Sequence, residues 1–319
     1  MSQKTRVGVI GVGYLGSIHA RIYARMPNVE LVGVVDIDPG LARKVGAECN
    51  CDSFNSPEQL LDEVDAVSIV VPTTLHREVS ELFIDNNVDI LLEKPVAHTV
   101  EDAQALVEAA ENAGIILQIG HLERFNAGVI ALADMLDHPR FFEVHRLGTF
   151  VERATDVDVI TDLMIHDIDI VLSLVDSPLS RVMAVGTPVV TNHVDIANAR
   201  LEFENGTVAN VTASRVSSKK FRRIRVFGES NYLALNFADQ QLEVVKPEKT
   251  NSEDRFAEII SRDLKIEPRP PLDAELEHFI ECVQTRSKPL VGGRDGLEAL
   301  RVAEIVQRDI EAATSTPSK

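Results

Sequence analysis

The stretch DLMIHDIDIVL, residues 162–172, places three aspartates and a histidine in an otherwise apolar run. If this run forms a helix over about 159–175, Asp162, His166 and Asp169 share one narrow polar face. An imidazole suits the base of an alcohol oxidation, because its unperturbed pKa of about 6.5 lies close to neutral pH. Burying carboxylates beside a core is costly unless they are paired, so this face should meet water or a ligand. The alternative is an ordinary amphipathic helix whose polar side is solvated.

Lys94, in the sequence Glu93-Lys94-Pro95, is the second candidate for chemistry. It lies between the apolar run of an expected strand and a proline, which disfavours helical geometry at the preceding residue. These side chains suit hydride transfer from a carbinol carbon to a nicotinamide, with His166 taking the hydroxyl proton and Lys94 stabilising the alkoxide. Asp162 would orient His166 or pair with Lys94. The two roles are exchanged if burial lowers the lysine pKa far enough, and a surface ion pair is the structural alternative for Lys94.

A glycine-rich turn near the N-terminus predicts where a dinucleotide binds. Gly11, Gly13 and Gly16 follow an apolar strand and open a helical pattern. Gly11 allows the tight turn, Gly13 lets backbone N–H groups approach a pyrophosphate, and Gly16 allows the helix to pack closely on the strand. The predicted cofactor contacts of this turn are Gly11, Gly13, Tyr14, Leu15 and Gly16.

Asp36 ends a second apolar strand, LVGVVD. At this position a carboxylate accepts hydrogen bonds from the ribose hydroxyls of the dinucleotide. It would also repel a 2′-phosphate. We therefore expect NAD rather than NADP as the cofactor. The structural alternative for Asp36 is a solvated acidic residue at a strand end.

Further apolar runs at 66–73, 88–95 and 114–121 alternate with helical patterns at 75–86 and 100–113. This alternation predicts an α/β fold with a doubly wound parallel Rossmann sheet, which we assign to residues 1–122. Ligands bind such sheets beyond the carboxyl ends of the strands. The cofactor contacts expected there are Pro72, Thr73, His76, Glu93 and Lys94, and the expected substrate contacts are His121, Arg124, Asn126 and Asp169.

From about residue 140 the periodicity becomes strand-like, with turn signals such as Asn205-Gly206. We expect residues 123–319 to form a substrate-binding α+β domain on a large, open, mainly antiparallel sheet of six or more strands. Small and β-branched residues alternate along these strands, which favours a homodimer or homotetramer through the sheet. Residues 248–271, charged and then proline-rich, are expected to be a mobile surface excursion. The expected helices of this half are 159–175, 272–286 and 294–314.

The 319-residue chain is 45% hydrophobic and 26% charged, with a net charge of −18. Its length favours two domains, and its acidity argues against nucleic acid or an anionic membrane surface as partners. The absence of a spanning apolar stretch and of a cleavage signature favours the cytoplasm. The three cysteines, Cys49, Cys51 and Cys282, are too few for a disulfide framework and form a poor zinc pattern. We expect reduced thiols and no metal.

Two charged features have no settled interpretation from the residues alone. The run SSKKFRRIR, residues 217–225, is the only dense basic run in this acidic chain. It could be a solvated edge, or a diphosphate-binding patch for a nucleotide-sugar assisted by Arg146 or Arg153. Asp167 falls on the apolar side of the 159–175 helix, where we expect it to cap a neighbouring backbone amide.

The pieces GVGYLGSIHA, VPTTLHREV, EKPVA, GHLERFN and DLMIHDID together resemble the Gfo/Idh/MocA family, the group of glucose–fructose oxidoreductase and inositol dehydrogenase. The resemblance implies a Rossmann domain joined to an α/β domain, and oxidation or reduction of sugars, polyols or nucleotide-sugars with NAD(P). It also implies that Lys94, Asp162 and His166 form the catalytic set, and that the bond between Lys94 and Pro95 is cis.

A narrower resemblance concerns the second half. GHLERFN, TDVDVITDLMIHDIDIVLSLV and VDIANARLEFENGTVANVTASRV are similar to the branch of the family that oxidises UDP-N-acetylglucosamine at C3. An inositol, polyol or free-sugar dehydrogenase is the alternative within the family. A regulator that binds a dinucleotide without turnover is the alternative outside enzymes, and the joint presence of Lys94, Asp162 and His166 speaks against it.

Overall fold

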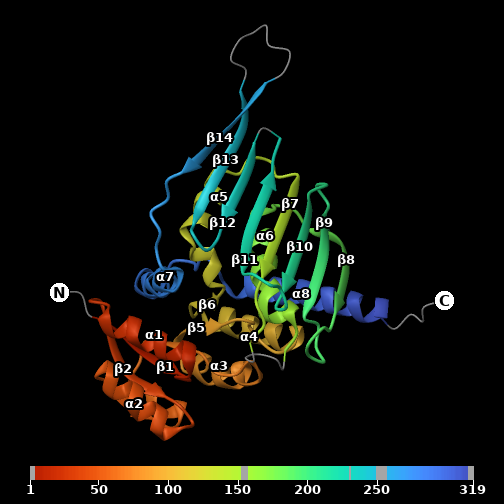
Figure 1. Cartoon of the computed structure of the whole chain (residues 1–319). Helices are drawn as coiled ribbons and strands as arrows, with labels where there is room; N and C mark the ends of the chain where they lie inside the picture. Colours follow the sequence, from red (N-terminus) through yellow and green to blue (C-terminus); the bar gives the residue numbers. More distant parts are fainter. Residues whose placement is uncertain (1–3, 152–156, 230, 249–256, 315–319) are drawn as a thin grey trace. The chain divides into compact units, whose positions relative to one another are not determined.

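The computed structural model describes residues 4–151, 157–229, 231–248 and 257–314 (Figure 1). The chain divides into two compact units. Unit 1 contains residues 1–122 and 272–300, and unit 2 contains residues 123–271 and 301–319. This differs from the two continuous segments expected above, because residues 272–300 return to unit 1.

Unit 1 is built on a parallel sheet of six strands in the order β3-β2-β1-β4-β5-β6. This is the strand order of a Rossmann fold, and it confirms the predicted doubly wound sheet. The strands are β1 (Thr5–Ile10), β2 (Val29–Val35), β3 (Asp52–Phe54), β4 (Ala66–Ile69), β5 (Asp89–Glu93) and β6 (Leu117–Gly120). The helices between them are α1 (Tyr14–Arg25), α2 (Pro39–Cys49), α3 (His76–Ile84) and α4 (Val100–Ala113).

A fifth helix of unit 1, α7 (Pro271–Thr285), comes from late in the chain. Its buried residues Leu276, Phe279 and Ile280 share one hydrophobic core with β1, β2 and α1. Just after α7, Arg286 forms an ion pair of 2.5 Å with Asp89 of β5. The sequence pattern shows which face of such a helix is apolar, but it does not show which of the two sheets that face packs against, so its partner was not predictable. The last helix, α8 (Gly293–Thr314), follows.

Unit 2 contains a sheet of eight strands in the order β14-β13-β12-β11-β7-β10-β9-β8. Every neighbouring pair is antiparallel except β10 and β7, which confirms the open, mainly antiparallel sheet. The strands are β7 (Phe141–Leu147), β8 (Leu179–Thr187), β9 (Ile196–Phe203), β10 (Val208–Ser214), β11 (Phe221–Phe227), β12 (Tyr232–Asn236), β13 (Gln241–Glu248) and β14 (Glu258–Leu264).

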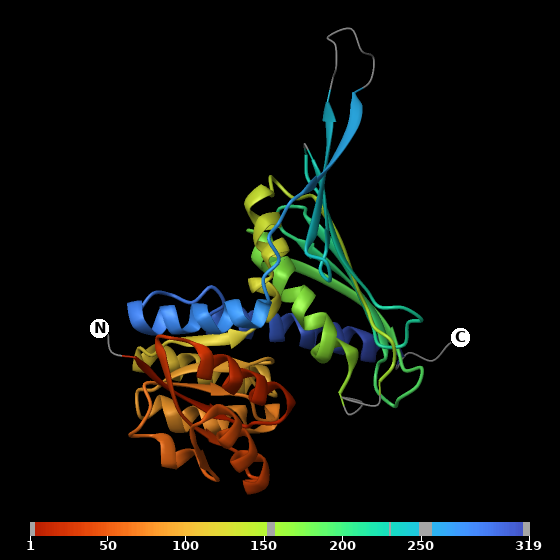
Figure 2. The same ribbon diagram turned by 60° about the vertical axis from the view of Figure 1, so that its left-hand side comes forward.

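One face of this sheet carries helices α5 (Ala127–Met135) and α6 (Ile165–Leu174) (Figure 2). Helix α6 packs on β7 and β10, and α5 packs on β12 and β13. Along β7, Phe142, Val144 and Arg146 point to this face and are buried. The opposite face carries no described helix (Figure 2).

The segment expected to be a mobile excursion contains a strand. Residues 258–264 form β14, which pairs along its whole length with residues 242–248 of β13 at the edge of the sheet (Figure 1). Almost all of its residues are exposed, so the sequence EIISRDL lacks the alternating apolar pattern by which a half-buried strand is predicted. Residues 249–256 of the expected excursion lie outside the described part of the chain.

Candidate active site

The glycine turn of unit 1 has the geometry that a dinucleotide requires. Gly11 has a φ of +82°, and a Cβ there would lie 2.6 Å from the carbonyl oxygen of Val70. A Cβ on Gly16 would overlap the carbonyl oxygen of Gly11. A Cβ on Gly13 would meet nothing within 4 Å. Gly11 and Gly16 are therefore required by the protein itself, whereas the space beside Gly13 is where backbone N–H groups can receive a pyrophosphate.

The two residues between these glycines present different side chains to this space. Tyr14 opens α1 and is 75% exposed, and Leu15 is half-buried. Gly13 precedes the first turn of α1, where unpaired backbone N–H groups and the helix dipole favour an anion.

Asp36 is held beside this turn by the backbone. Its Oδ2 accepts a hydrogen bond of 2.9 Å from the Val12 N–H, and its Oδ1 accepts one of 2.9 Å from the Asp38 N–H. The carboxylate is only partly buried, so it keeps lone pairs for a ribose. A second carboxylate follows closely, since Asp38 caps α2 through the N–H groups of Gly40 and Leu41. Both negative charges oppose an added phosphate.

His76 is 1% exposed and connects the loops after β4 and β5. Its Nδ1 lies 2.9 Å from the carbonyl oxygen of Pro95 and its Nε2 lies 3.0 Å from that of Val71. Burial lowers the pKa of His76. Both ring nitrogens thus face the backbone, which positions the Lys94–Pro95 segment rather than offering a nitrogen to a cofactor.

Glu93 and Lys94 follow β5. Lys94–Pro95 is a cis peptide bond, as the resemblance implies. The Glu93 carboxylate is 7% exposed, accepts the Lys94 N–H at 3.2 Å and lies 3.4 Å from His19 of α1. Gly120 leaves room for it, because a Cβ there would lie 3.0 Å from the carboxylate. The remaining strand-end residues differ in exposure, with Pro72 exposed, Thr73 and Lys94 half-buried, and His121 1% exposed.

The Asp162–His166 segment of unit 2 begins with a π-turn, Ile160–Met164, which continues into α6. In an α-helix, two residues four positions apart, such as Asp162 and His166, point in directions that differ by about 40° around the helix axis. The π-turn closes over five residues, so each residue advances by a smaller angle and Asp162 comes closer to the line of His166. Asp158 caps the turn through the N–H groups of Ile160 and Thr161. Asp162 is half-buried and His166 is 9% exposed.

Two of the expected substrate contacts lie at the start of unit 2. Arg124 contacts Asp169 of α6 at 3.4 Å, and the Asp169 side chain is 2% exposed. Asn126 is also 2% exposed and caps α5, because its Oδ1 accepts the Gly128 N–H at 2.9 Å. The structure thus links Arg124 and Asp169 beside His166, whereas it gives the Asn126 side chain a structural role.

Asp167 does not cap a backbone amide, as expected above, but pairs with Arg146 of β7. The Arg146 guanidinium donates two hydrogen bonds of 2.8 Å to the Asp167 carboxylate and one of 3.0 Å to Glu123. All three residues are buried, and although burial opposes the charge, Asp167 and Glu123 together raise the pKa of Arg146. Arg146 is therefore committed to this network. Its alternation with Phe142 and Val144 was the signal that could have revealed a buried arginine.

The basic run divides between two faces of the sheet. Arg223 pairs with Glu243 at 3.4 Å, and Arg225 pairs with Glu143. Lys219 and Lys220 are exposed before β11 begins. Arg153, the other residue proposed to assist this run, lies outside the described residues.

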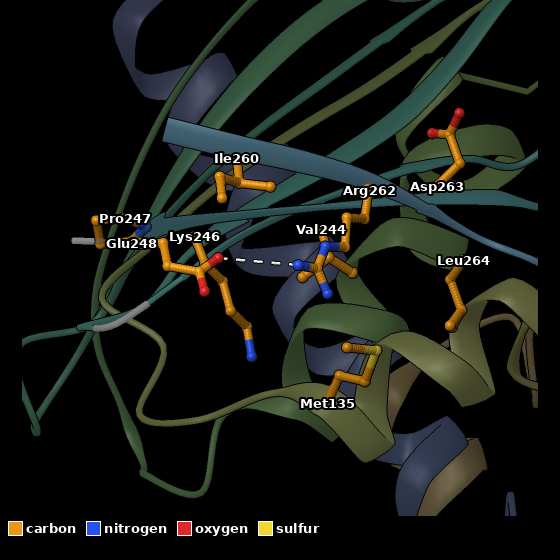
Figure 3. Close-up of a pocket in the computed structure, with 9 residues that line it drawn as sticks. All are labelled: Met135, Val244, Lys246, Pro247, Glu248, Ile260, Arg262, Asp263 and Leu264. Atoms are coloured by element: carbon orange, nitrogen blue, oxygen red, sulfur yellow. Dashed lines mark ion pairs between the residues drawn. The ribbon is translucent and has the colours of Figure 1, made fainter. Parts of the chain in front are cut away.

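A cavity of about 580 Å³ lies in unit 2 away from all of these residues (Figure 3). It is lined by Met135 of α5 and by residues of β13 and β14, across which Glu248 and Arg262 pair at 3.8 Å. None of the expected site residues lines it. Within the described ranges, no group of histidines, cysteines and acids could hold a metal ion, and no helix is long and apolar enough to span a membrane.

The sheet order and the glycine turn are those of a dinucleotide-binding Rossmann fold. Residues 5–121 match the model "Oxidoreductase family, NAD-binding Rossmann fold", and residues 132–234 match "GFO/IDH/MocA C-terminal domain". The chain therefore belongs to the Gfo/Idh/MocA family, as its motifs predict.

Similar proteins span the whole length. UDP-N-acetylglucosamine 3-dehydrogenase of Acidithiobacillus ferrooxidans is 37% identical, over 96% of this chain and 97% of that protein. A solved structure of UDP-N-acetylglucosamine 3-dehydrogenase from that organism has a TM-score of 0.90 and covers 98% of this chain and 99% of its own. The scyllo-inositol 2-dehydrogenase (NAD(+)) of Bacillus subtilis is 28% identical, over 95% of this chain and 93% of that protein. The chain is thus an enzyme of the dehydrogenase class.

Proposed function

We propose that the protein oxidises the C3 hydroxyl of UDP-N-acetylglucosamine with NAD. The observation that carries this proposal is the 37% identity to a UDP-N-acetylglucosamine 3-dehydrogenase over 96% of the chain. Lys94, Asp162 and His166 are all present and lie in defined local structures, which supports an enzyme rather than a dinucleotide-binding regulator.

The proposed chemistry assigns one task to each side chain. Bound NAD supplies the hydride acceptor for the hydrogen on the carbinol carbon. A ring nitrogen of His166 takes the hydroxyl proton as the C=O bond forms, and the Lys94 ammonium donates a hydrogen bond to the same oxygen. Asp162 orients the imidazole or pairs with Lys94. Lys94 belongs to unit 1 and His166 to unit 2, so the proposal requires both to reach one substrate. The exchanged assignment, with Lys94 as base, stays open.

We propose NAD rather than NADP on the basis of Asp36. Its carboxylate is fixed by two backbone N–H groups at the end of β2, and Asp38 adds a second negative charge two residues later. The ribose hydroxyls of NAD can donate hydrogen bonds to this carboxylate, whereas the 2′-phosphate of NADP is repelled by its negative charge.

We further propose a homodimer or homotetramer in the cytoplasm. The face of the unit 2 sheet opposite α5 and α6 presents Phe141, Phe227 and Tyr232. The centre of the Phe227 ring lies 5.7 Å from that of Phe141 and 4.8 Å from that of Tyr232. Clustered aromatic rings on a sheet face that no described helix covers favour association with a second copy. The three cysteines are free thiols, as a reducing compartment requires. Light scattering coupled to gel filtration measures the mass, and a monomer would contradict the association.

A substrate panel tests the proposed activity. NADH formation is followed with UDP-N-acetylglucosamine, UDP-glucose, myo-inositol, scyllo-inositol and free N-acetylglucosamine. We expect the highest kcat/KM for UDP-N-acetylglucosamine, with a 3-keto product. Faster oxidation of an inositol would establish the second candidate, which the relative from Bacillus subtilis supports. Tight NAD binding without turnover of any compound would instead favour a regulator.

A further inference from the structure

The arginines of strand β11 have different surroundings on the two faces of the sheet. Arg223 and Arg225 point to the helix-free face of the sheet, where each has an acidic partner on a neighbouring strand. Arg222 points the other way, with Ile224 and Val226, which are 1% and 0% exposed. This is the face on which α6 carries His166 and Asp169.

On that face Arg222 lies directly opposite another arginine. The register of β11 and β7 pairs Arg222 with Arg146. Like charges at directly opposed positions of antiparallel strands destabilise the pair. Burial lowers the pKa of Arg222, and the Arg146 charge lowers it further. The arrangement therefore disfavours the Arg222 cation unless an anion lies beside it.

The acidic groups nearby are largely used by Arg146. The carboxylates of Asp167 and Glu123 both accept hydrogen bonds from the buried Arg146 guanidinium, at 2.8 and 3.0 Å. Among the described residues, the Arg222 guanidinium reaches one carboxylate, that of Glu123, at 3.6 Å, which is an ion pair without hydrogen-bond geometry. Its side chain is 48% exposed. Arg222 is thus the outer cation of the cluster, with donors left for a ligand.

Strand β11, which carries Arg222, lies beside elements of the candidate site. Helix α6 lies over β7 and β10, and α5 lies over β12 and β13, so β11 runs between the two helices. Glu123, which contacts both arginines, is followed by Arg124, which contacts Asp169 on α6. A chain of contacts therefore connects Arg222 to the helix that bears His166.

We propose that Arg222 binds the diphosphate of the nucleotide-sugar substrate. The inference rests on the proposed function and names the residue that recognises the anionic part of that substrate. A guanidinium offers a planar fork of donors that matches phosphate oxygens. A bound diphosphate would also neutralise the opposed charges of Arg222 and Arg146.

The test compares Arg222→Gln with Arg223→Gln, its neighbour on the opposite face of the same strand. Calorimetry measures UDP binding, and NADH formation gives kcat and KM for UDP-N-acetylglucosamine. Loss of a hydrogen-bonded charge contact should raise the UDP Kd and the KM roughly 10- to 100-fold in Arg222→Gln, with kcat changed by less than about threefold. Arg223→Gln should leave UDP binding unchanged. Arg222→Lys, which keeps the charge without the fork, should give an intermediate Kd.

Thermal unfolding of each variant separates binding from folding. Because Arg222→Gln removes a repulsion, its Tm should not fall. Equal UDP affinity of wild type and Arg222→Gln would overturn the inference while leaving the proposed function intact, and so would equal losses in Arg222→Gln and Arg223→Gln. A wild-type protein that binds no UDP would contradict the proposed substrate itself.

Discussion

The proposed cofactor site in unit 1 and the proposed substrate site in unit 2 are held in place by different kinds of interaction. In unit 1 the proposed cofactor site is shaped mainly by backbone: Gly11 and Gly16 are required by sterics, and the Asp36 side chain is held by backbone N–H groups. In unit 2 the site consists of side chains held by other side chains, as with Asp167 on Arg146 and Asp169 on Arg124. A backbone site serves one cofactor shared by many enzymes, whereas a side-chain site can change with the substrate. The two regions should therefore respond differently to substitution.

The largest effect is expected at His166. His166→Ala should lower kcat roughly 10²- to 10⁴-fold, because it removes the proposed acceptor of the hydroxyl proton. NAD affinity, measured by calorimetry, should stay within about threefold of wild type, since the proposed cofactor contacts lie in unit 1. His138→Ala is the matched control, because the His138 side chain is 81% exposed. Equal losses of kcat and NAD affinity would show that the separation into two kinds of site is wrong.

The next effect concerns stability and is confined to unit 2. Arg146→Met leaves Asp167 and Glu123 buried without their common partner, which should cost about 3–5 kcal/mol of unfolding free energy. Arg200→Met removes a half-exposed pair with Glu202 and should cost at most about 1 kcal/mol. Urea denaturation followed by circular dichroism measures both.

A double variant sharpens this result. Arg146→Met with Asp167→Leu removes both buried charges of the main pair and should recover much of the lost stability, because the penalty comes from an unpaired charge. If Arg146→Met proves no more costly than Arg200→Met, the buried network does not hold α6 on the sheet.

Unit 1 offers the opposite combination, a binding defect without a stability defect. Gly13→Ala adds a methyl group where the protein has no atom within 4 Å, so the Tm should stay unchanged. The same methyl group occupies the approach to the pyrophosphate and should weaken NAD roughly tenfold or more. Gly16→Ala is the informative contrast, because its Cβ overlaps the Gly11 carbonyl oxygen and should lower the Tm as well. A Gly13→Ala protein with wild-type NAD affinity would remove the cofactor from this turn.

The same contrast explains what the sequence could predict. The glycine spacing, the strand-helix alternation and the polar stripe of α6 are local patterns, and each predicted its element. The partners of Arg146, the return of α7 to unit 1 and the pairing of β14 with β13 depend on residues far apart in the chain. The π-turn at Asp162 was also not predictable, because it differs from an α-helix by one residue in a single turn.

His76 and Asn126 show the same limit within the site. Their positions at a strand end and before a helix fit ligand contacts, but the side chains face the backbone: His76 toward Val71 and Pro95, and Asn126 toward the first turn of α5. A polar residue near a site is often the residue that fixes the site's backbone. Sequence position alone does not separate these two roles.

The smallest expected effect tests whether Asp36 acts by contact or only by charge. Asp36→Asn keeps one acceptor oxygen but removes the charge, and should raise the ratio of NADP to NAD affinity about tenfold. Asp38→Asn removes a charge two residues away and still caps α2, because asparagine is as good an N-cap as aspartate. It should change the ratio less than about threefold. Fluorescence titration with NADH and NADPH measures both variants without any substrate. Equal changes in the two variants would mean that a diffuse negative potential selects NAD, and the proposed cofactor site would then depend on side-chain charge as much as the proposed substrate site does.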